Sequence, residues 1–301
     1  MSMEKKVKVL VPATTANLGS GFDCLGMALD LYNSFEFELG IEGFSVQGEG
    51  RQQLELDGGR LVYEAWDAAF NFANVPPPTV ALHIESKIPL GRGLGSSATA
   101  VVAGVCGANI LGGLQLATAE LISIASVIEG HSDNVAPALL GGLVVSAVWK
   151  DEVDYIVLDP ADTLQVVVAV PDFELSTERA RSVLPDMVSR ADAVFNTSRA
   201  ALFVAAWTQK KWELLGRAME DRLHQPFRGS LVPGLNQVVE AAMAAGALGS
   251  ALSGAGPSVV ALTAGGHGAV GQVMQQAFAQ HGIDCRILVT RSVGQGAHLA
   301  I

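Results

Sequence analysis

Apolar residues recur at every second position in several short segments of the chain. Residues 6–11 read KVKVLV and residues 35–39 read FEFEL, so each segment has one apolar face and one largely charged face. This period of two predicts half-buried β-strands. The same part of the chain holds further predicted elements: a strand over 80–84, helices over 97–111 and 118–128, and a strand over 143–149.

The second half begins after a polar segment at 158–163 and has a different order of elements. Allowing for extra helices, strands and helices follow the β-α-β-β-α-β order of the ferredoxin-like unit. We therefore predict an α+β protein of two domains, an N-terminal domain over residues 1–160 and a ferredoxin-like C-terminal domain over residues 161–301. The predicted elements are a strand over 164–170, helices over 187–207, 210–221 and 235–245, strands over 248–252 and 258–263, a helix over 269–281 and a strand over 285–290.

Composition narrows the class of protein. Half of the 301 residues are hydrophobic, 16% are charged and the formal net charge is −11, which argues against binding nucleic acid by phosphate neutralisation. ATP can still bind where a loop, a helix end and Mg²⁺ supply a local positive field. Cys24, Cys106 and Cys285 show no metal-ligand spacing. The apolar stretch near the N-terminus is too short for a signal peptide, and no long apolar run predicts a membrane span. We expect a cytoplasmic protein with reduced thiols.

Residues 88–100, IPLGRGLGSSATA, are the most informative segment. Three alternate glycines allow tight turns and bring backbone N–H groups close to a ligand, and a helix begins at the serines that follow. A helix N-terminus holds unpaired donors and the positive end of the macrodipole, so the segment predicts a phosphate-binding loop. It is neither a Walker loop nor a dinucleotide fingerprint. The residues expected to bind the nucleotide phosphates are Pro89, Leu90, Gly91, Arg92, Gly93, Leu94, Gly95, Ser96 and Ser97.

A surface turn with Ser96 as helix N-cap would also explain this loop, but two other segments favour a binding site. Residues 12–23, PATTANLGSGFD, contain a tight turn that presents Asn17 and Asp23. An amide and a carboxylate so placed suit a small substrate with a hydroxyl and an ammonium group, with a simple Asx turn as the alternative. Residues 252–258, LSGAGPS, fit a hairpin loop and a binding loop equally well.

In order and content, these three segments resemble the signature segments of the GHMP small-molecule kinases, and within that superfamily the homoserine kinases. The resemblance covers essentially the whole chain. It departs from the usual first segment at Thr15 and Ser20, where serine and proline are common, and both changes keep the hydroxyl or the bend. It implies the two-domain GHMP kinase fold, with an N-terminal domain like domain 2 of ribosomal protein S5, and it implies ATP and Mg²⁺ as cofactors.

Residues 129–137, EGHSDNVAP, extend the resemblance, with Ser132 in place of a common proline. In the family the matching glutamate helps to hold Mg²⁺, which implies Glu129 as a metal ligand together with Ser97. The matching histidine, His131, would lie at the substrate pocket. The alternatives are a solvated carboxylate and an exposed loop histidine, although a carboxylate at a helix end needs a partner against the dipole.

Residues 175–185 and 224–228 carry the remaining matches. Arg181 and Arg228 match two arginines that grip the substrate carboxylate, a contact that suits a bidentate guanidinium. Thr177 matches a threonine near the phosphoryl-transfer centre. An ordinary surface arginine is the alternative in each case, and we accept it for Arg179.

The resemblance therefore implies an ATP-dependent kinase that phosphorylates the side-chain hydroxyl of L-homoserine on the route to threonine. Asp23 would hold the substrate ammonium and Asn17 the reacting hydroxyl, while Thr177 and His131 would orient that hydroxyl or relay its proton. Asp133 is the nearest candidate for a general base, but the homoserine kinases are thought to do without one, and aligned phosphoryl transfer does not demand one. The apolar slot expected for adenine contains Leu61, Val62 and Tyr63.

Other functions stay open at this point. A related kinase could act on mevalonate, phosphomevalonate or a sugar, but Asp23 facing an ammonium group favours an amino acid. A diphosphomevalonate decarboxylase would also consume ATP. A binding or regulatory protein would have no reason to retain Ser96, Ser97 and Glu129. The family is often dimeric, so the resemblance also allows a homodimer, and neither nucleic acid nor a membrane is expected as a partner.

Overall fold

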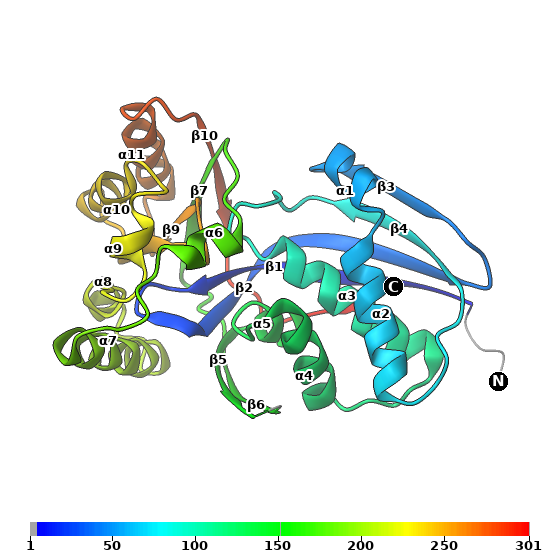
Figure 1. The fold of residues 1–301 in the computed structure, drawn as a ribbon. Coiled ribbons are helices and arrows are strands. Elements are labelled where there is room, and N and C mark those ends of the chain that lie inside the picture. The colour runs from blue at the N-terminus through cyan, green and yellow to red at the C-terminus, as the bar shows by residue number, and fades with distance from the viewer. Residues whose placement is uncertain (1–4, 151, 301) are drawn as a thin grey trace.

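The computed structural model describes residues 5–150 and 152–300, which form two adjoining sheets with helices on their faces (Figure 1). The first sheet has strand order β11-β1-β2-β4-β3, and β5 pairs with both β2 and β6. Only its β3–β4 pair is parallel. Its strands are β1 (Lys6–Asn17), β2 (Gly21–Leu39), β3 (Phe44–Gly48), β4 (Val80–Ser86), β5 (Leu143–Trp149), β6 (Glu152–Leu158) and β11 (His298–Leu299).

Helices cover one face of this sheet (Figure 1). They bury a core that includes Phe35 and Phe37 of β2 and the stacked ring of Trp66. The helices of this half are α1 (Arg51–Asp57), α2 (Arg60–Phe72), α3 (Ser96–Gly112), α4 (Thr118–Glu129) and α5 (Val135–Leu140). The α3 and α4 helices confirm the two helices predicted here, whereas α1, α2 and α5 were not predicted.

The second sheet confirms the ferredoxin-like prediction, because its antiparallel order β10-β7-β9-β8 is the fourth, first, third and second strand of that unit. Two helices, α10 (Leu235–Ala244) and α11 (His267–Ala279), pack together on one of its faces. The strands are β7 (Gln165–Pro171), β8 (Gly249–Leu252), β9 (Val259–Thr263) and β10 (Cys285–Thr290). The other helices of this half are α6 (Thr177–Ser182), α7 (Arg190–Thr208), η1 (Trp212–Leu214), α8 (Leu215–Ala218) and α9 (Gln225–Arg228).

The two halves share a hydrophobic core. Leu25 and Met27 of β2 belong to the same buried cluster as Val166 and Val168 of β7 and Phe203 of α7. Burying such side chains stabilises the junction by about 1.5–3 kcal/mol each. The predicted division between residues 160 and 161 falls in the segment joining β6 to β7, and the last described residues return to the first sheet through β11.

The hairpin between β1 and β2 extends beyond the first sheet and inserts its tip among the helices of the second half (Figure 1). This contact explains why the helix predicted over 210–221 is wrong: only the short η1 and α8 form there. Ser20 Oγ donates to the carbonyl of Ala218 (2.7 Å), and the N–H of Arg222, which a continuing helix would pair with that carbonyl, donates instead to Asn196 Oδ1 (2.8 Å). The tip thus ends the helix by taking its acceptor.

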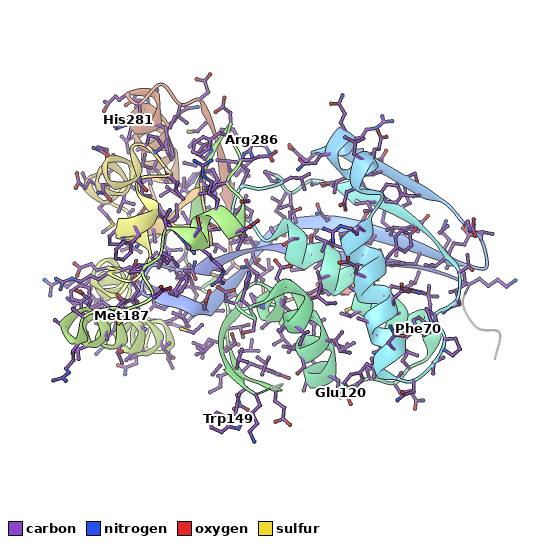
Figure 2. All side chains as sticks on the ribbon, viewed as in Figure 1. Phe70, Glu120, Trp149, Met187, His281 and Arg286 are labelled. Atoms are coloured by element: carbon purple, nitrogen blue, oxygen red, sulfur yellow. The ribbon has the colours of Figure 1, made fainter. Side chains whose placement is uncertain are left out.

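Both charged and apolar side chains lie at the surface (Figure 2). Trp149, at the end of β5, is 67% exposed and projects from the lower edge of the molecule in this view. Within residues 5–150 and 152–300, the structure contains no helix with the length and apolar character needed to span a bilayer.

Candidate active site

The three glycine-containing segments meet at the junction of the two sheets, although they are far apart in the sequence. The N–H of Gly254 donates to the carbonyl of Ala16 (3.0 Å), and Ser253 Oγ donates to the carbonyl of Gly93 (2.6 Å). Asn17 Nδ2 donates to the carbonyl of Gly254 (2.9 Å). All three segments therefore form one hydrogen-bonded cluster.

The predicted phosphate loop ends at the N-terminus of α3. Gly91, Gly93 and Gly95 have φ values of 60°, 72° and 68°, the left-handed region that favours glycine. Gly95 itself is the N-cap, so Ser96 is the first helical residue rather than the cap. In the described part of the chain, no group accepts from the backbone N–H groups of Ser96 and Ser97. These donors and the positive helix end can receive an anion.

One prediction concerns the close packing of this loop against the third segment. A Cβ on Gly93 would lie 2.1 Å from the carbonyl oxygen of Ser253. Gly93→Ala should therefore lower the free energy of unfolding by about 2–5 kcal/mol, from left-handed strain plus steric overlap. Gly113→Ala is the matched control, because Gly113 has φ +59° and open space around its Cβ position. It should cost only about 1–2 kcal/mol in urea unfolding. Equal losses would contradict the packing.

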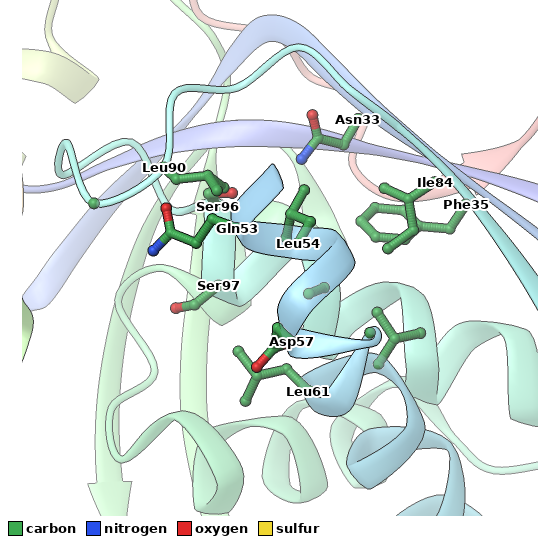
Figure 3. Close-up of a pocket in the computed structure, with 14 residues that line it drawn as sticks. Asn33, Phe35, Gln53, Leu54, Asp57, Leu61, Ile84, Leu90, Ser96 and Ser97 are labelled. Carbon is green, nitrogen blue, oxygen red and sulfur yellow. The ribbon is translucent and has the colours of Figure 1, made fainter. Parts of the chain in front are cut away.

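An apolar slot of about 220 Å³ lies beside the loop and is lined in part by residues of α1 (Figure 3). Leu61 and Val62, two of the three residues expected to contact adenine, line this slot. Tyr63 does not, because its hydroxyl donates to the carbonyl of Gly43 (3.2 Å) outside the slot. The other lining residues are Asn33, Phe35, Gln53, Leu54, Asp57, Gly59, Ile84, Leu90, Gly91, Ser96, Ser97 and Ala100.

A polar cleft of about 180 Å³ shares Gly91, Ser96 and Ser97 with this slot. It brings together most of the residues predicted for catalysis and phosphate binding, whereas Pro89 lines neither space. An apolar slot joined to a polar cleft by a glycine loop has the shape and chemistry for a nucleotide base with its phosphates. The predicted residues lining the cleft are Asn17, Gly91, Arg92, Gly93, Leu94, Gly95, Ser96, Ser97, Glu129, His131, Thr177 and Arg228.

The predicted metal ligands are in direct contact in this cleft. Ser97 Oγ donates a hydrogen bond to Glu129 Oε1, and Glu129 is the last residue of α4. Burial raises the pKa of Glu129 above its ordinary value. In the described part of the chain, no cluster of three or more His, Cys, Asp and Glu side chains could hold a metal unaided. The pair fits Mg²⁺, which binds proteins through one or two carboxylates and completes its shell with phosphate oxygens and water.

His131 and Asp133 form a second acidic–basic pair in the cleft. His131 Nδ1 lies 2.7 Å from Asp133 Oδ1, a contact that is short in distance but too poorly directed to count as a good hydrogen bond. Burial lowers the pKa of His131, but Asp133 and Glu129 raise it by more, so this pKa lies above its ordinary value. Asp133 is almost completely buried from solvent, so it is placed to support His131.

Asp23 and Arg181 were predicted to hold opposite ends of a zwitterion, and the structure pairs them with each other. The guanidinium of Arg181, on α6, donates two hydrogen bonds to the Asp23 carboxylate, at 2.8 and 2.9 Å. About a third of each side chain is exposed. An ion pair that accessible contributes at most about 1 kcal/mol, so a bound ligand can replace it.

Arg228 lies deeper, with 2% of its surface exposed. Burial lowers its pKa to about 10, so the guanidinium is still charged at neutral pH. Phe22, which was not predicted, lies beneath both arginines: its ring centre is 5.2 Å from the Cζ of Arg228 and 5.6 Å from that of Arg181. Such cation–π contacts hold guanidinium groups without using their N–H donors. The aromatic residue inside the first segment was the signal that could have indicated it.

Comparisons with known proteins match both halves of the chain. The model for the GHMP kinases N terminal domain matches residues 60–142, and that for GHMP kinases C terminal matches residues 200–280. The chain is 46% identical over 296 residues to the homoserine kinase of Carboxydothermus hydrogenoformans, covering 97% of this chain and 96% of that protein.

Solved structures extend the likeness to three dimensions. The crystal structure of homoserine kinase from Cytophaga hutchinsonii has a TM-score of 0.87 and 31% identity, covering 100% of this chain and 99% of that one. The L. major mevalonate kinase structure has a TM-score of 0.71 and 18% identity, covering 97% of this chain and 98% of that one, which shows a shared fold alone.

Proposed function

The chain belongs to the homoserine kinase family of the GHMP kinases, and from this premise we propose that it transfers the γ-phosphoryl group of ATP to the side-chain hydroxyl of L-homoserine. The product is O-phospho-L-homoserine, on the route to threonine. One observation carries the assignment of the site: the open helix start at Ser96 and Ser97 and the acidic and basic groups around Glu129 and Arg228 line a single cleft.

The nucleotide would lie across both spaces of the site. Adenine fits the apolar slot between Leu61, Val62 and Leu54, and Gln53 and Asp57 stand at its polar rim (Figure 3). The triphosphate would follow the glycine loop to the N-terminus of α3. There the unpaired N–H groups and the helix dipole attract negative charge.

Ser97 and Glu129 would hold Mg²⁺ beside the phosphates of ATP. When bound, Mg²⁺ would neutralise the charge that develops on the transferred group. The raised pKa of Glu129 supports this role, because a divalent ion stabilises the charged form of a partly buried carboxylate.

L-Homoserine would bind by exchanging ion pairs. Its ammonium group would replace the Arg181 guanidinium at Asp23, and its carboxylate would join Arg181 and Arg228. The opposite charges that the zwitterion needs are thus already paired with each other in the structure. Because Asp23 and Arg181 are partly exposed, the exchange costs little.

The reaction would be an in-line phosphoryl transfer. The homoserine hydroxyl oxygen forms a bond to the γ-phosphorus while the bond from that phosphorus to the β,γ-bridging oxygen breaks, and ADP leaves with the electron pair. Asn17 and Thr177 would orient the hydroxyl. Its proton would pass to His131 or to water in the cleft. Alignment and charge neutralisation suffice for such a step.

A coupled ADP-release assay tests the proposal. Purified protein would be offered L-homoserine, mevalonate, phosphomevalonate, diphosphomevalonate and a sugar, each with Mg²⁺-ATP. We expect turnover with L-homoserine at a rate well above that of the other compounds. Turnover with another compound and none with L-homoserine would overturn the proposal.

A charge-removing substitution tests the ammonium contact. Asp23→Asn should raise the KM for L-homoserine about 30- to 100-fold, because the substrate ammonium group loses its charge-assisted contact with the Asp23 carboxylate. The KM for ATP should stay within about twofold, since Asp23 lies outside the nucleotide slot. Steady-state kinetics with each substrate varied in turn measures both values. A KM for homoserine that does not change would rule out this role for Asp23.

The proposal includes a cytoplasmic location and a homodimer as the state to test first. The three cysteines are free thiols, as in proteins of reducing compartments. Light scattering of the purified protein would determine the oligomeric state.

A further inference from the structure

His224 is a titratable side chain near the substrate site with no exposed surface. It lies at the N-terminal end of α9, four residues before Arg228. Its Nε2 lies 2.7 Å from the carbonyl oxygen of Gly19, at the tip of the β1–β2 hairpin. Its Nδ1 lies 3.2 Å from Nη1 of Arg228. The ring therefore bridges the hairpin that carries Asp23 and the arginine expected to bind the substrate carboxylate.

The two partners fix the protonation state of the ring. A carbonyl oxygen only accepts hydrogen bonds, so Nε2 must carry the proton and donate to Gly19. A guanidinium only donates, so Nδ1 must be unprotonated and accept from Arg228. One neutral tautomer of His224 satisfies both contacts, and a protonated ring satisfies only the first.

The contact with His224 is one of three that orient the guanidinium of Arg228. Its Nε donates to the carbonyl of Ala180 (3.1 Å), and Nη1 also donates to the carbonyl of Gly254 (3.0 Å). Within residues 5–150 and 152–300, no group accepts from Nη2. The protein thus uses three of the five N–H donors and leaves both on one nitrogen for a ligand.

Packing and backbone contacts hold the imidazole itself in place. The ring of Phe22 stacks on it with centres 5.1 Å apart and an interplanar angle of 22°. The carboxylate of Asp221 accepts from the backbone N–H groups of Leu223, His224 and Gln225, at 2.7–3.0 Å, and so fixes the start of α9. The ring of His224 is therefore held by stacking against Phe22, by the hydrogen bond of its backbone N–H to Asp221 and by a partner at each ring nitrogen.

We propose that His224, held as the neutral Nε2–H tautomer, is a positioning residue that orients Arg228 to receive the substrate carboxylate and ties it to the hairpin carrying Asp23. This inference rests on the proposed function, because it presumes that Arg228 binds the carboxylate of L-homoserine. It goes beyond the proposed roles because His224 lines neither the apolar slot nor the polar cleft and acts only through Arg228.

Low pH should disturb this arrangement. The charged groups near the ring are Arg228 on α9, Asp23 on β2 and Asp221 on the preceding loop, whose Oδ2 lies 3.5 Å from Nε2. Burial lowers the pKa of His224 below its ordinary value of 6.5, so the ring is neutral at neutral pH. A second proton on Nδ1 would point at Arg228 and remove its acceptor. The KM for L-homoserine should therefore rise as the pH falls below the ordinary histidine range.

Two variants separate the hydrogen bonds of His224 from its packing. His224→Phe keeps an aromatic ring on Phe22 but has neither donor nor acceptor, and should raise the KM for L-homoserine about 10- to 100-fold. His224→Gln supplies an amide donor and acceptor in place of the two ring nitrogens. It should recover most of that loss and should also abolish the acid-side rise in this KM. The KM for ATP should stay within about twofold in both variants.

The outcomes distinguish this inference from the proposed function. If wild-type protein turns over L-homoserine and His224→Phe leaves its KM unchanged, or raises both KM values equally, His224 does not position Arg228. If His224→Gln is as impaired as His224→Phe, the donor–acceptor pattern is not what matters. Should His224→Phe fail to fold, comparison of the pH profiles of wild type and His224→Gln decides: identical acid limbs would overturn the proposal. No turnover of L-homoserine by wild type would instead refute the proposed function.

Discussion

Glu129→Gln should lower kcat about 10²- to 10³-fold, the size of effect seen when one charge-stabilising group is removed from an active site. Glutamine preserves the size of the side chain and an oxygen that can accept from Ser97 Oγ. It removes the negative charge that would hold Mg²⁺ beside the phosphates. Turnover measured at saturating ATP across a Mg²⁺ titration gives kcat and the metal dependence together. A normal Mg²⁺ dependence in this variant would contradict metal binding by Glu129.

The stability of the same variant provides its control. The pKa of Glu129 is raised in the folded protein, from an ordinary value of 4.5, so burial of the charged form opposes folding at neutral pH. Glu129→Gln should therefore unfold at a temperature no lower than wild type at pH 7. The difference should disappear as the pH falls below 4.5, where the carboxyl is protonated in both the folded and unfolded states. A variant that is less stable at pH 7 and also inactive would show that Glu129 has a structural role instead.

Arg228→Met should raise the KM for L-homoserine about 100-fold or more, because a buried charge paired with a carboxylate is lost. Methionine fills much of the buried volume, which limits the cavity cost that alanine would add. The KM for ATP should change by no more than about twofold, since Arg228 does not line the apolar slot. Steady-state kinetics with homoserine and ATP varied separately measures both.

Arg179→Met is the matched control for that substitution. Arg179 lies on α6 close to Arg181, but it is exposed and forms no ion pair with any residue of the described chain. Its replacement should leave the KM for homoserine within about twofold of wild type. Equal effects of the two substitutions, or an equal rise in both KM values for Arg228→Met, would exclude a specific carboxylate contact at Arg228.

The strands of the second half and its longer helices α7, α10 and α11 could be predicted from their apolar patterns, whereas the helix predicted over 210–221 was wrong and the short α6 and α9 were not predicted. The strand over 285–290 and the β-α-β-β-α-β order are both confirmed. The α2 helix was missed although its buried residues recur at helical spacing, because it follows directly on two glycines.

The first segment shows a limit of periodicity. Residues 12–17 read as the start of a polar turn, yet they continue β1. Thr14 and Thr15 are fully buried there because each finds a distant partner, Thr14 with Asn134 (2.8 Å) and Thr15 with Ser253 (2.8 Å). A buried hydroxyl is tolerated only when it is hydrogen-bonded, and no local pattern reveals a partner more than a hundred residues away.

The site residues could be predicted by matching motifs, but not their mutual contacts. The pairing of Asp23 with Arg181 joins residues 158 positions apart. It depends on the hairpin tip and α6 reaching the same cleft from different halves of the molecule. The neutral state of His224 likewise follows only from the two partners that the fold supplies. These contacts depend on the tertiary structure, so the sequence alone does not predict them.

Comparison of L-homoserine with two incomplete analogues tests most directly whether a zwitterion is recognised and phosphorylated at its hydroxyl. 4-Hydroxybutyrate lacks the ammonium group, and 3-aminopropan-1-ol lacks the carboxylate. With Mg²⁺-ATP, kcat/KM for L-homoserine should exceed that of either analogue about a hundredfold or more, since each leaves a charged protein group unpaired. Phosphorus NMR should identify the product as the phosphate ester of the homoserine hydroxyl. An analogue used as well as L-homoserine, or ATP consumed without that ester, would contradict the account.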